Sequence, residues 1–174
     1  RDVERSRGLG DVYKRQVRAA LIIIGNEILS GRTQDANIAW IAQHLGALGV
    51  RLVEVRVIAD EDQAIAIAVN TLRSTHDYVF TTGGIGPTHD DITARAVSAA
   101  FGRELVRHEG AVHLLESHYA GRSVEVTAAQ LKMADLPEGA ELIENPVSGA
   151  AGFQVENVFV MAGIPEIMQA QFAS

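Results

Sequence analysis

The chain of 174 residues contains no cysteine. This absence excludes disulfide bonds and thiolate metal sites, and it suits the reducing cytoplasm, where we expect the protein to act. No apolar run approaches the roughly 20 residues of a membrane-spanning helix, and no signal-peptide pattern is visible, so we expect no membrane partner. Hydrophobic residues still make up 47% of the chain, which is enough for one domain with a sizeable core.

Positive charge is also scarce, because 15 lysines and arginines face 22 aspartates and glutamates. Residues 1–16 hold five basic and three acidic residues, which leaves a net charge of −9 on residues 17–174. An acidic domain binds nucleic acid poorly, so we expect no nucleic-acid partner. An anionic ligand would have to be held by backbone amides or by a bound cation.

Residues 1–16 show no sustained apolar period, and we interpret them as a non-native or disordered tail. A basic arm that binds nucleic acid is the alternative interpretation. We expect residues 17–174 to form the domain, and we expect it to be truncated at its C-terminus because the chain stops within a predicted helix.

Strands and helices alternate along the first part of the chain. The continuous apolar run at residues 19–24 is typical of a central strand buried on both faces. The pattern then predicts a helix, a strand, a helix, a strand and a helix, at residues 35–48, 51–58, 61–74, 78–82 and 92–101. This alternation favours a layered α/β domain with a mostly parallel sheet.

The second part is less regular. Helices are predicted at residues 110–119 and 126–134, a turn at residues 137–139, and short strands at residues 141–143, 152–155 and 158–161. We expect the last two strands to form a hairpin around Glu156 and Asn157. Pro165 suits the start of a further helix.

The most informative segment is the glycine-rich stretch from Thr81 to Thr93, between a predicted strand and a predicted helix. Its glycines allow positive φ and the close approach of a ligand, and the amides at the helix start suit a phosphate. Asp90 and Asp91 at the same helix start could hold a hard cation. A purely structural turn, with the aspartates as helix caps, is the simpler alternative. The stretch is not a dinucleotide fingerprint, because His89 occupies the third glycine position.

Three glycine turns follow predicted strands directly, at Gly25, Gly83 and Gly163. In a parallel α/β sheet, ligands bind outside the carboxyl ends of the strands. If these strands are parallel, the three turns lie on one edge of the sheet and line a single pocket.

Residues 83–93 resemble the G-G-x-G-P-T-x-D-D-x-T motif of the competence/damage-inducible protein A (CinA) family, within the larger group of molybdopterin-binding (MoaB/Mog-like) domains. Residues 24–31 are similar to that family's opening turn. Residues 161–166 are similar to its late loop, with Ala162 in place of proline. Residues 145–153 resemble its N-P-x-G-T-A-P-G-F loop less closely. The resemblance implies a three-layer α/β/α sandwich with a mostly parallel central sheet.

The resemblance also implies a set of site residues. Asp91 and Asp90 would be the catalytic carboxylates and the metal ligands. The other ligand-binding positions would be Gly25, Glu27, Gly83, Gly84, Gly86, Thr88, Thr93, Ser148, Gly149, Gly163 and Pro165. Glu27 could equally be a solvated charge, and the two threonines could simply cap the turn.

Two activities follow from the resemblance. The first is metal-dependent hydrolysis of a nucleotide pyrophosphate such as ADP-ribose, with a divalent Mg, Mn or Co ion. The second is a molybdopterin-binding domain acting in molybdenum cofactor biosynthesis, and a non-catalytic assembly domain is a third possibility. The P-T-x-D-D form favours the first. We expect a homo-oligomer that binds a small-molecule nucleotide or pterin.

Overall fold

The computed structural model describes residues 16–122 and 124–174. Apart from Gln16, the predicted tail at residues 1–16 therefore lies outside the described residues. Within the described part of the chain, no helix is long and apolar enough to cross a membrane.

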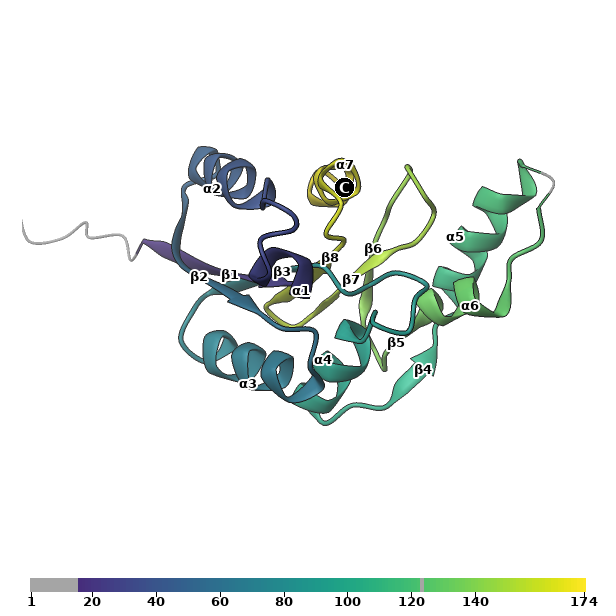
Figure 1. The fold of residues 1–174 in the computed structure, drawn as a ribbon, viewed down its shortest axis with the longest axis horizontal. Coiled ribbons are helices and arrows are strands. Elements are labelled where there is room, and N and C mark those ends of the chain that lie inside the picture. The colour runs from purple at the N-terminus through teal and green to yellow at the C-terminus, as the bar shows by residue number, and fades with distance from the viewer. Residues whose placement is uncertain (1–15, 123) are drawn as a thin grey trace, which may run out of the picture.

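A six-stranded sheet forms the centre of the domain (Figure 1). Its strands, in spatial order, are β2 (Val50–Ile58), β1 (Val17–Ile24), β3 (Tyr78–Thr82), β8 (Val158–Met161), β7 (Gly152–Val155) and β6 (Glu141–Ile143). The first four are mutually parallel. β7 pairs antiparallel with β8, and β6 pairs antiparallel with β7, so only β7 runs opposite to the other strands. The predicted mostly parallel sheet is confirmed, as is the hairpin that links β7 to β8.

Helices cover both faces of this sheet, which confirms the three-layer arrangement (Figure 1). On one face lie α2 (Asn37–Ala47) and α7 (Pro165–Phe172), and on the other lie α3 (Asp62–Arg73) and α4 (Thr93–Phe101). The short α1 (Asn26–Leu29) follows β1 directly. α5 (Glu109–Ala120) and α6 (Ala128–Leu131) lie to the side of the sheet, past its β6 edge, and we call this segment the α5–α6 arm.

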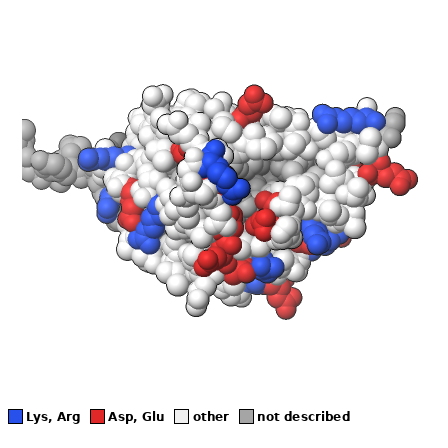
Figure 2. Space-filling view, viewed as in Figure 1, with Lys and Arg blue, Asp and Glu red and all other residues white. Residues whose placement is uncertain are grey.

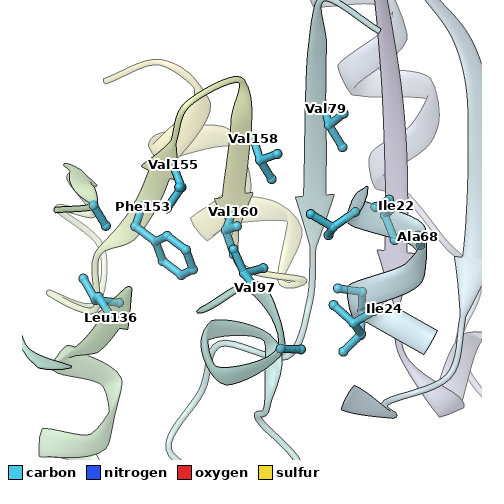
Figure 3. Close-up of a cluster of buried hydrophobic side chains, with 14 of the residues drawn as sticks. Ile22, Ile24, Ala68, Val79, Val97, Leu136, Phe153, Val155, Val158 and Val160 are labelled. Atoms are coloured by element: carbon cyan, nitrogen blue, oxygen red, sulfur yellow. The ribbon is translucent and has the colours of Figure 1, made fainter. Parts of the chain in front are cut away.

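The apolar run of β1 is continuous because both of its faces are buried. Leu21 and Ile23 belong to the core cluster under α2 and α7. Ile22 and Ile24 belong to the larger cluster on the α3 and α4 side, which Figure 3 shows in close-up. A strand between two helical layers needs apolar residues at every position, not at alternate ones.

The structure adds elements that the pattern did not predict. β4 (Leu105–Arg107) and β5 (Asp135–Pro137) form a separate antiparallel pair, so Pro137 ends a strand and was wrongly assigned to the turn after it. The helix predicted at residues 126–134 divides into α6 and a 3₁₀ turn, η1 (Lys132–Ala134). Strands of three residues are too short to show an alternating pattern.

Candidate functional site

The carboxyl ends of β1, β3 and β8 meet at one edge of the sheet and bring together three turns that are distant in sequence. A Cβ added to Gly163 would lie 3.2 Å from the Cα of Gly83, so the turns after β8 and β3 are in backbone contact. The Gly83 amide donates to the Met161 carbonyl at 3.1 Å. The predicted meeting of these turns is confirmed, since β1, β3 and β8 run parallel.

The conformation of the β3 turn requires glycine at two positions. Gly83 and Gly84 have φ values of 105° and 68°, a region that other L-residues rarely adopt. A Cβ on Gly83 would collide with the carbonyl oxygen of Ile24, and one on Gly84 would collide with the hydroxyl of Thr93. The turn therefore folds back tightly onto β1 and onto the start of α4.

Thr93, at the start of α4, holds this turn in place from its buried side. Its side chain is fully buried, its hydroxyl donates to the Gly83 carbonyl at 3.0 Å, and its amide donates to the Gly84 carbonyl at 3.0 Å. The predicted ligand residue Thr93 therefore lies beneath the turn, outside the cavity lining. The hydroxyl proton of Thr93 is already donated to a carbonyl of the loop.

Three successive backbone amides of this turn are left without a hydrogen-bond acceptor among the described residues. Within the described part of the chain, no hydrogen bond from the amides of Gly84, Ile85 and Gly86 is found. Successive unpaired amides in a glycine-rich turn form a concave site of partial positive charge that suits an anion. The turn lacks lysine and arginine, so only the backbone amides could contribute partial positive charge to an anion held there.

The cavity over these turns has a volume of about 510 Å³. Figure 2 shows the hollow on the face that carries α1, between α7 and the α5–α6 arm. It is lined by Glu27, Thr33, Gly83, Gly84, Ile85, Gly86, Pro87, Asp91, Tyr119, Met133, Asn145, Ser148, Ala150, Ala162, Gly163, Ile164, Pro165 and Ile167. This lining contains two carboxylates and no lysine or arginine.

Asp91 is one of the two carboxylates in this cavity. Its Oδ2 atom accepts from the amide of Thr88 at 2.8 Å and from the Thr88 hydroxyl at 2.6 Å. These bonds hold the side chain of Asp91 against the turn, where a Cβ on Gly86 would lie 2.6 Å from Oδ2. Thr88 itself does not line the cavity, so it acts on the site through Asp91.

Asp90 takes a different direction. Its side chain is 73% exposed, lies outside the cavity lining, and has its Oδ1 atom 3.1 Å from Nε2 of His89. The two neighbouring aspartates therefore do not converge in the structure. Among the described residues, no group of three or more His, Cys, Asp or Glu side chains could hold a metal ion.

Glu27 is the second carboxylate of the cavity and comes from α1. A Cβ on Gly25 would lie 2.6 Å from Glu27 Oε1, so the carboxylate rests over the Gly25 backbone. Gly25 thus lies behind Glu27 and not in the lining. The turn is tied to β2 by the Gly25 amide, which donates to the Ile58 carbonyl, and is stabilised by Asp60, which accepts from the Asn26 amide at 2.8 Å.

The loop after β6 is organised by Asn145, which the sequence analysis did not single out. Asn145 is buried, and its Oδ1 accepts from the amides of Val147 and Ser148 while its Nδ2 donates to the Ala150 carbonyl and to Ser148 Oγ. Ser148 is thus an acceptor towards Asn145, and its own hydroxyl proton can be donated into the cavity. Gly149 faces α5 instead, because a Cβ there would lie 2.5 Å from that of His118.

Gln171 is a second residue that the sequence analysis missed. It is buried in α7, its Oε1 accepts from the Ala162 amide at 2.8 Å, and its Nε2 donates to the Ala150 carbonyl at 3.3 Å. It therefore connects two of the loops that line the cavity. The available signal was a glutamine three residues after Met168, on the apolar face of its helix.

Comparison with known proteins identifies the family of this chain. Residues 20–174 match the family model described as a probable molybdopterin binding domain. The chain belongs to this family and is a CinA-type member of it. The chain is 33% identical to CinA of Thermoplasma acidophilum, whose crystal structure it matches with a TM-score of 0.82 over 90% of this chain and 94% of that one.

Other relatives extend this result. A CinA-like protein of Desulfosudis oleivorans is 37% identical over 155 residues, which are 87% of this chain and 38% of the relative. A protein of Aeropyrum pernix is 41% identical over 159 residues, which are 89% of this chain and 59% of the relative. The chain therefore spans about three fifths or less of the length of these curated relatives. MoaB of Thermus thermophilus shares the fold, with a TM-score of 0.58 at 16% identity over 90% of this chain and 87% of that one.

Proposed function

We propose that the cavity binds a nucleotide through its pyrophosphate group and that the domain hydrolyses this group with the help of a divalent cation. The observation that carries this proposal is the run of unpaired amides from Gly84 to Gly86 beside the Asp91 carboxylate. Amides suit phosphate oxygens, and a carboxylate in the same cavity suits a cation that the phosphates share.

The carboxylates of the cavity fit a cation that a phosphate ligand completes. Mg²⁺ is commonly held by one or two carboxylates together with substrate phosphates, so a cluster of three protein ligands is not required. Asp91 and Glu27 would supply these two carboxylates. When bound, the cation would neutralise phosphate charge and make water a stronger nucleophile.

The chain's own residues would orient the ligand. Thr88 holds Asp91 by two hydrogen bonds, so this carboxylate is preorganised. The amides of the turn would stabilise charge that develops on the phosphates, and the Ser148 hydroxyl would donate to an oxygen on the opposite side. Hydrolysis of ADP-ribose would break one P–O bond of the pyrophosphate, consume one water and release AMP and ribose 5-phosphate.

Asp90 keeps its predicted role as a second metal ligand only as a hypothesis. Its exposed side chain pairs with His89, so it would have to turn towards the cavity when the ligand binds. Comparing an Asp90 variant with an Asp91 variant separates the two roles.

A second candidate function is the retention of a molybdopterin without hydrolysis. The observation that favours it is the apolar part of the lining, where Tyr119, Met133 and Ile164 offer a surface for a flat ring beside the amide turn. The description of the matching family points the same way. Both candidates use the amides of the β3 turn, and they differ in whether a bond is broken.

Product analysis distinguishes these functions. The 174-residue chain is incubated with ADP-ribose and with Mg²⁺, Mn²⁺, Co²⁺ or EDTA, and the nucleotides are separated by chromatography. We expect AMP only with a divalent metal. ADP-ribose that binds in calorimetry but yields no AMP with any metal would support a binding or assembly domain. Binding of a pterin with no binding of ADP-ribose would support the second candidate.

A further inference from the structure

β2 is an edge strand with an unused side. It pairs with β1 along one side, and no other described strand pairs with its opposite side (Figure 1). The strand has nine residues, and its pairing with β1 is regular from Glu54 to Ile58 after a bulge opposite Ala19 and Ala20. Natural proteins usually shorten or cover such an edge, because it can pair with another strand.

Apolar side chains are exposed along this edge. Val53, Val55 and Val57 are 37%, 38% and 37% exposed. Val55 and Val57 lie opposite Leu21 and Ile23 of β1. Because Leu21 and Ile23 belong to the core cluster under α2, both valines lie on the sheet face that carries α2. A further strand added beside β2 would bring cross-strand neighbours to these valine side chains.

The backbone of β2 offers hydrogen bonds in the same direction. The Ile58 carbonyl accepts from the Gly25 amide, on the side of β1. Because successive residues in a strand direct their backbone groups to opposite sides, those of Val57 and Val55 point away from β1. Their amides and carbonyls are therefore available to a strand added at this edge.

We propose that two copies of this chain pair antiparallel through β2, about a two-fold axis at Val55, so that their sheets join into one. In this register Val55 lies opposite its own copy, and Val57 of each copy lies opposite the bulge of the other copy at Val53. Glu54 of each copy then lies opposite Arg56 of the other. The strand is thus complementary to itself in both apolar and charged residues.

Neighbouring registers lack this match. An axis at Val57 would place Glu54 opposite Asp60, which brings two acids together. An axis at Val53 would place Glu54 opposite Leu52, with no partner for the charge. Within one chain, Arg56 Nε already donates to Glu54 Oε1 at 2.8 Å, so the two charges are held side by side at the edge.

This assembly is independent of the proposed catalysis. The axis lies along the side of the sheet, whereas the cavity lies at the carboxyl ends of its strands, so each copy keeps its cavity open. A single strand pair is a small interface, and we expect a dissociation constant on the order of micromolar. Main-chain hydrogen bonds supply the affinity, and the Glu54–Arg56 pairs select the register.

The oligomeric state of the 174-residue chain tests the first part of this proposal. Sedimentation equilibrium from roughly 1 to 500 µM should give a monomer–dimer equilibrium. Val55→Pro removes an amide that faces outward, which an edge strand tolerates, and it should abolish the dimer while circular dichroism stays unchanged. A wild-type chain that is monomeric throughout this range, or a folded Val55→Pro chain that dimerises normally, would overturn the proposal.

A charge exchange tests the register. Glu54→Arg places two arginines opposite two others, and Arg56→Glu does the same with glutamates, so each variant should dimerise at least about tenfold more weakly. Mixing these two variants pairs every arginine with a glutamate and should restore a dimer, now a heterodimer. This result cannot arise from contacts within one chain. Folded single variants that dimerise like the wild type, or a mixture that stays monomeric, would refute the Val55-centred pairing.

Discussion

Single residues define the cavity through their backbone as much as through their side chains. The unpaired amides from Gly84 to Gly86 lie next to a carboxylate that Thr88 fixes in place. At this scale the chemistry depends on small groups held at short distances. Two of the residues concerned can be tested separately.

The first residue is Asp91. Asp91→Asn should lower metal-dependent turnover of ADP-ribose by roughly 100-fold or more, because it removes the negative charge of the carboxylate that we propose binds the cation. The neighbouring Asp90→Asn is the matched control and should change turnover by less than about threefold if its exposed carboxylate stays outside the site. Steady-state rates with Mg²⁺ and Mn²⁺ measure both effects. Equal losses would show that the aspartates act together on the metal, as their adjacency in sequence suggests.

The second residue is Gly84. Gly84→Ala should cost about 1–3 kcal/mol of folding free energy and weaken ligand binding, because the new Cβ meets the Thr93 hydroxyl and φ is 68°. Gly102→Ala is the control, since Gly102 has a φ of 62° but no neighbour within 4 Å of the added Cβ. It should lose only about 1–2 kcal/mol and keep full affinity. Urea denaturation and calorimetry give the two quantities, and equal affinity losses would argue against a role for the β3 turn in binding.

At the scale of elements, helix α7 connects the loops on one side of the cavity. Gln171→Leu keeps a similar volume but leaves the Ala162 amide without its acceptor, so we expect a loss of about 1–3 kcal/mol of stability. The ligand should also bind more weakly, because both loops that line the cavity lose a shared anchor. Gln169→Leu in the same helix should change stability by less than about 0.5 kcal/mol. If both variants behave alike in urea and in calorimetry, the connecting role of Gln171 is wrong.

Helices α3 and α4 are joined at the surface by Asp62 and Arg95. Arg95 donates two hydrogen bonds, at 2.9 and 2.7 Å, to the Asp62 carboxylate, and these bonds together with the charge of Arg95 lower the pKa of Asp62. A lowered pKa stabilises the fold at pH values above the unfolded pKa of about 3.8, and this contribution is lost as pH falls through the folded value.

Arg95→Ala should therefore cost less than about 1 kcal/mol at pH 7, because the pair is largely exposed. The difference from the wild type should shrink in roughly 1 M salt and disappear in acid, once Asp62 is protonated in both chains. Denaturation curves at several pH values measure it. A difference that persists unchanged in acid would mean that Arg95 acts by packing and not by charge.

Sequence patterns predicted the elements that are long and regular. The six-residue apolar run at residues 19–24 and the alternation from residue 51 to 58 each correspond to a strand of the sheet, because burial on one or both faces imposes a visible period. The pair of β4 and β5 had no such signal, since each strand has three residues. Their pairing depends on contacts between segments about 30 residues apart, which local periodicity does not encode.

The candidate site was predicted in the same uneven way. Its glycines could be predicted because a motif records where the backbone must turn, and Gly83, Gly84, Gly86 and Gly163 do line the cavity. The direction of a side chain is not recorded in a motif. Asp90 and Asp91 are adjacent in sequence, yet one faces solvent and the other faces the cavity. Gln171 acts through hydrogen bonds to the Ala162 amide and to the Ala150 carbonyl, so the tertiary structure was needed to find it. Asn145 bonds only within its own loop, to Val147, Ser148 and Ala150, and the sequence carried a local signal that was missed.

On the scale of the whole molecule, the backbone contact between Gly83 and Gly163 has a consequence for synthesis. Because the chain emerges from the ribosome from its N-terminus, β1, β2 and β3 are available long before the turn at Gly163. The wall that this turn forms cannot exist until β8 has inserted between β3 and β7. A nascent chain that ends just after the glycine-rich stretch thus contains most of the proposed binding groups, but it does not yet form the cavity. We therefore infer that ligand capture begins late in translation, and that a ligand present then would favour the completed domain over its partly folded precursors.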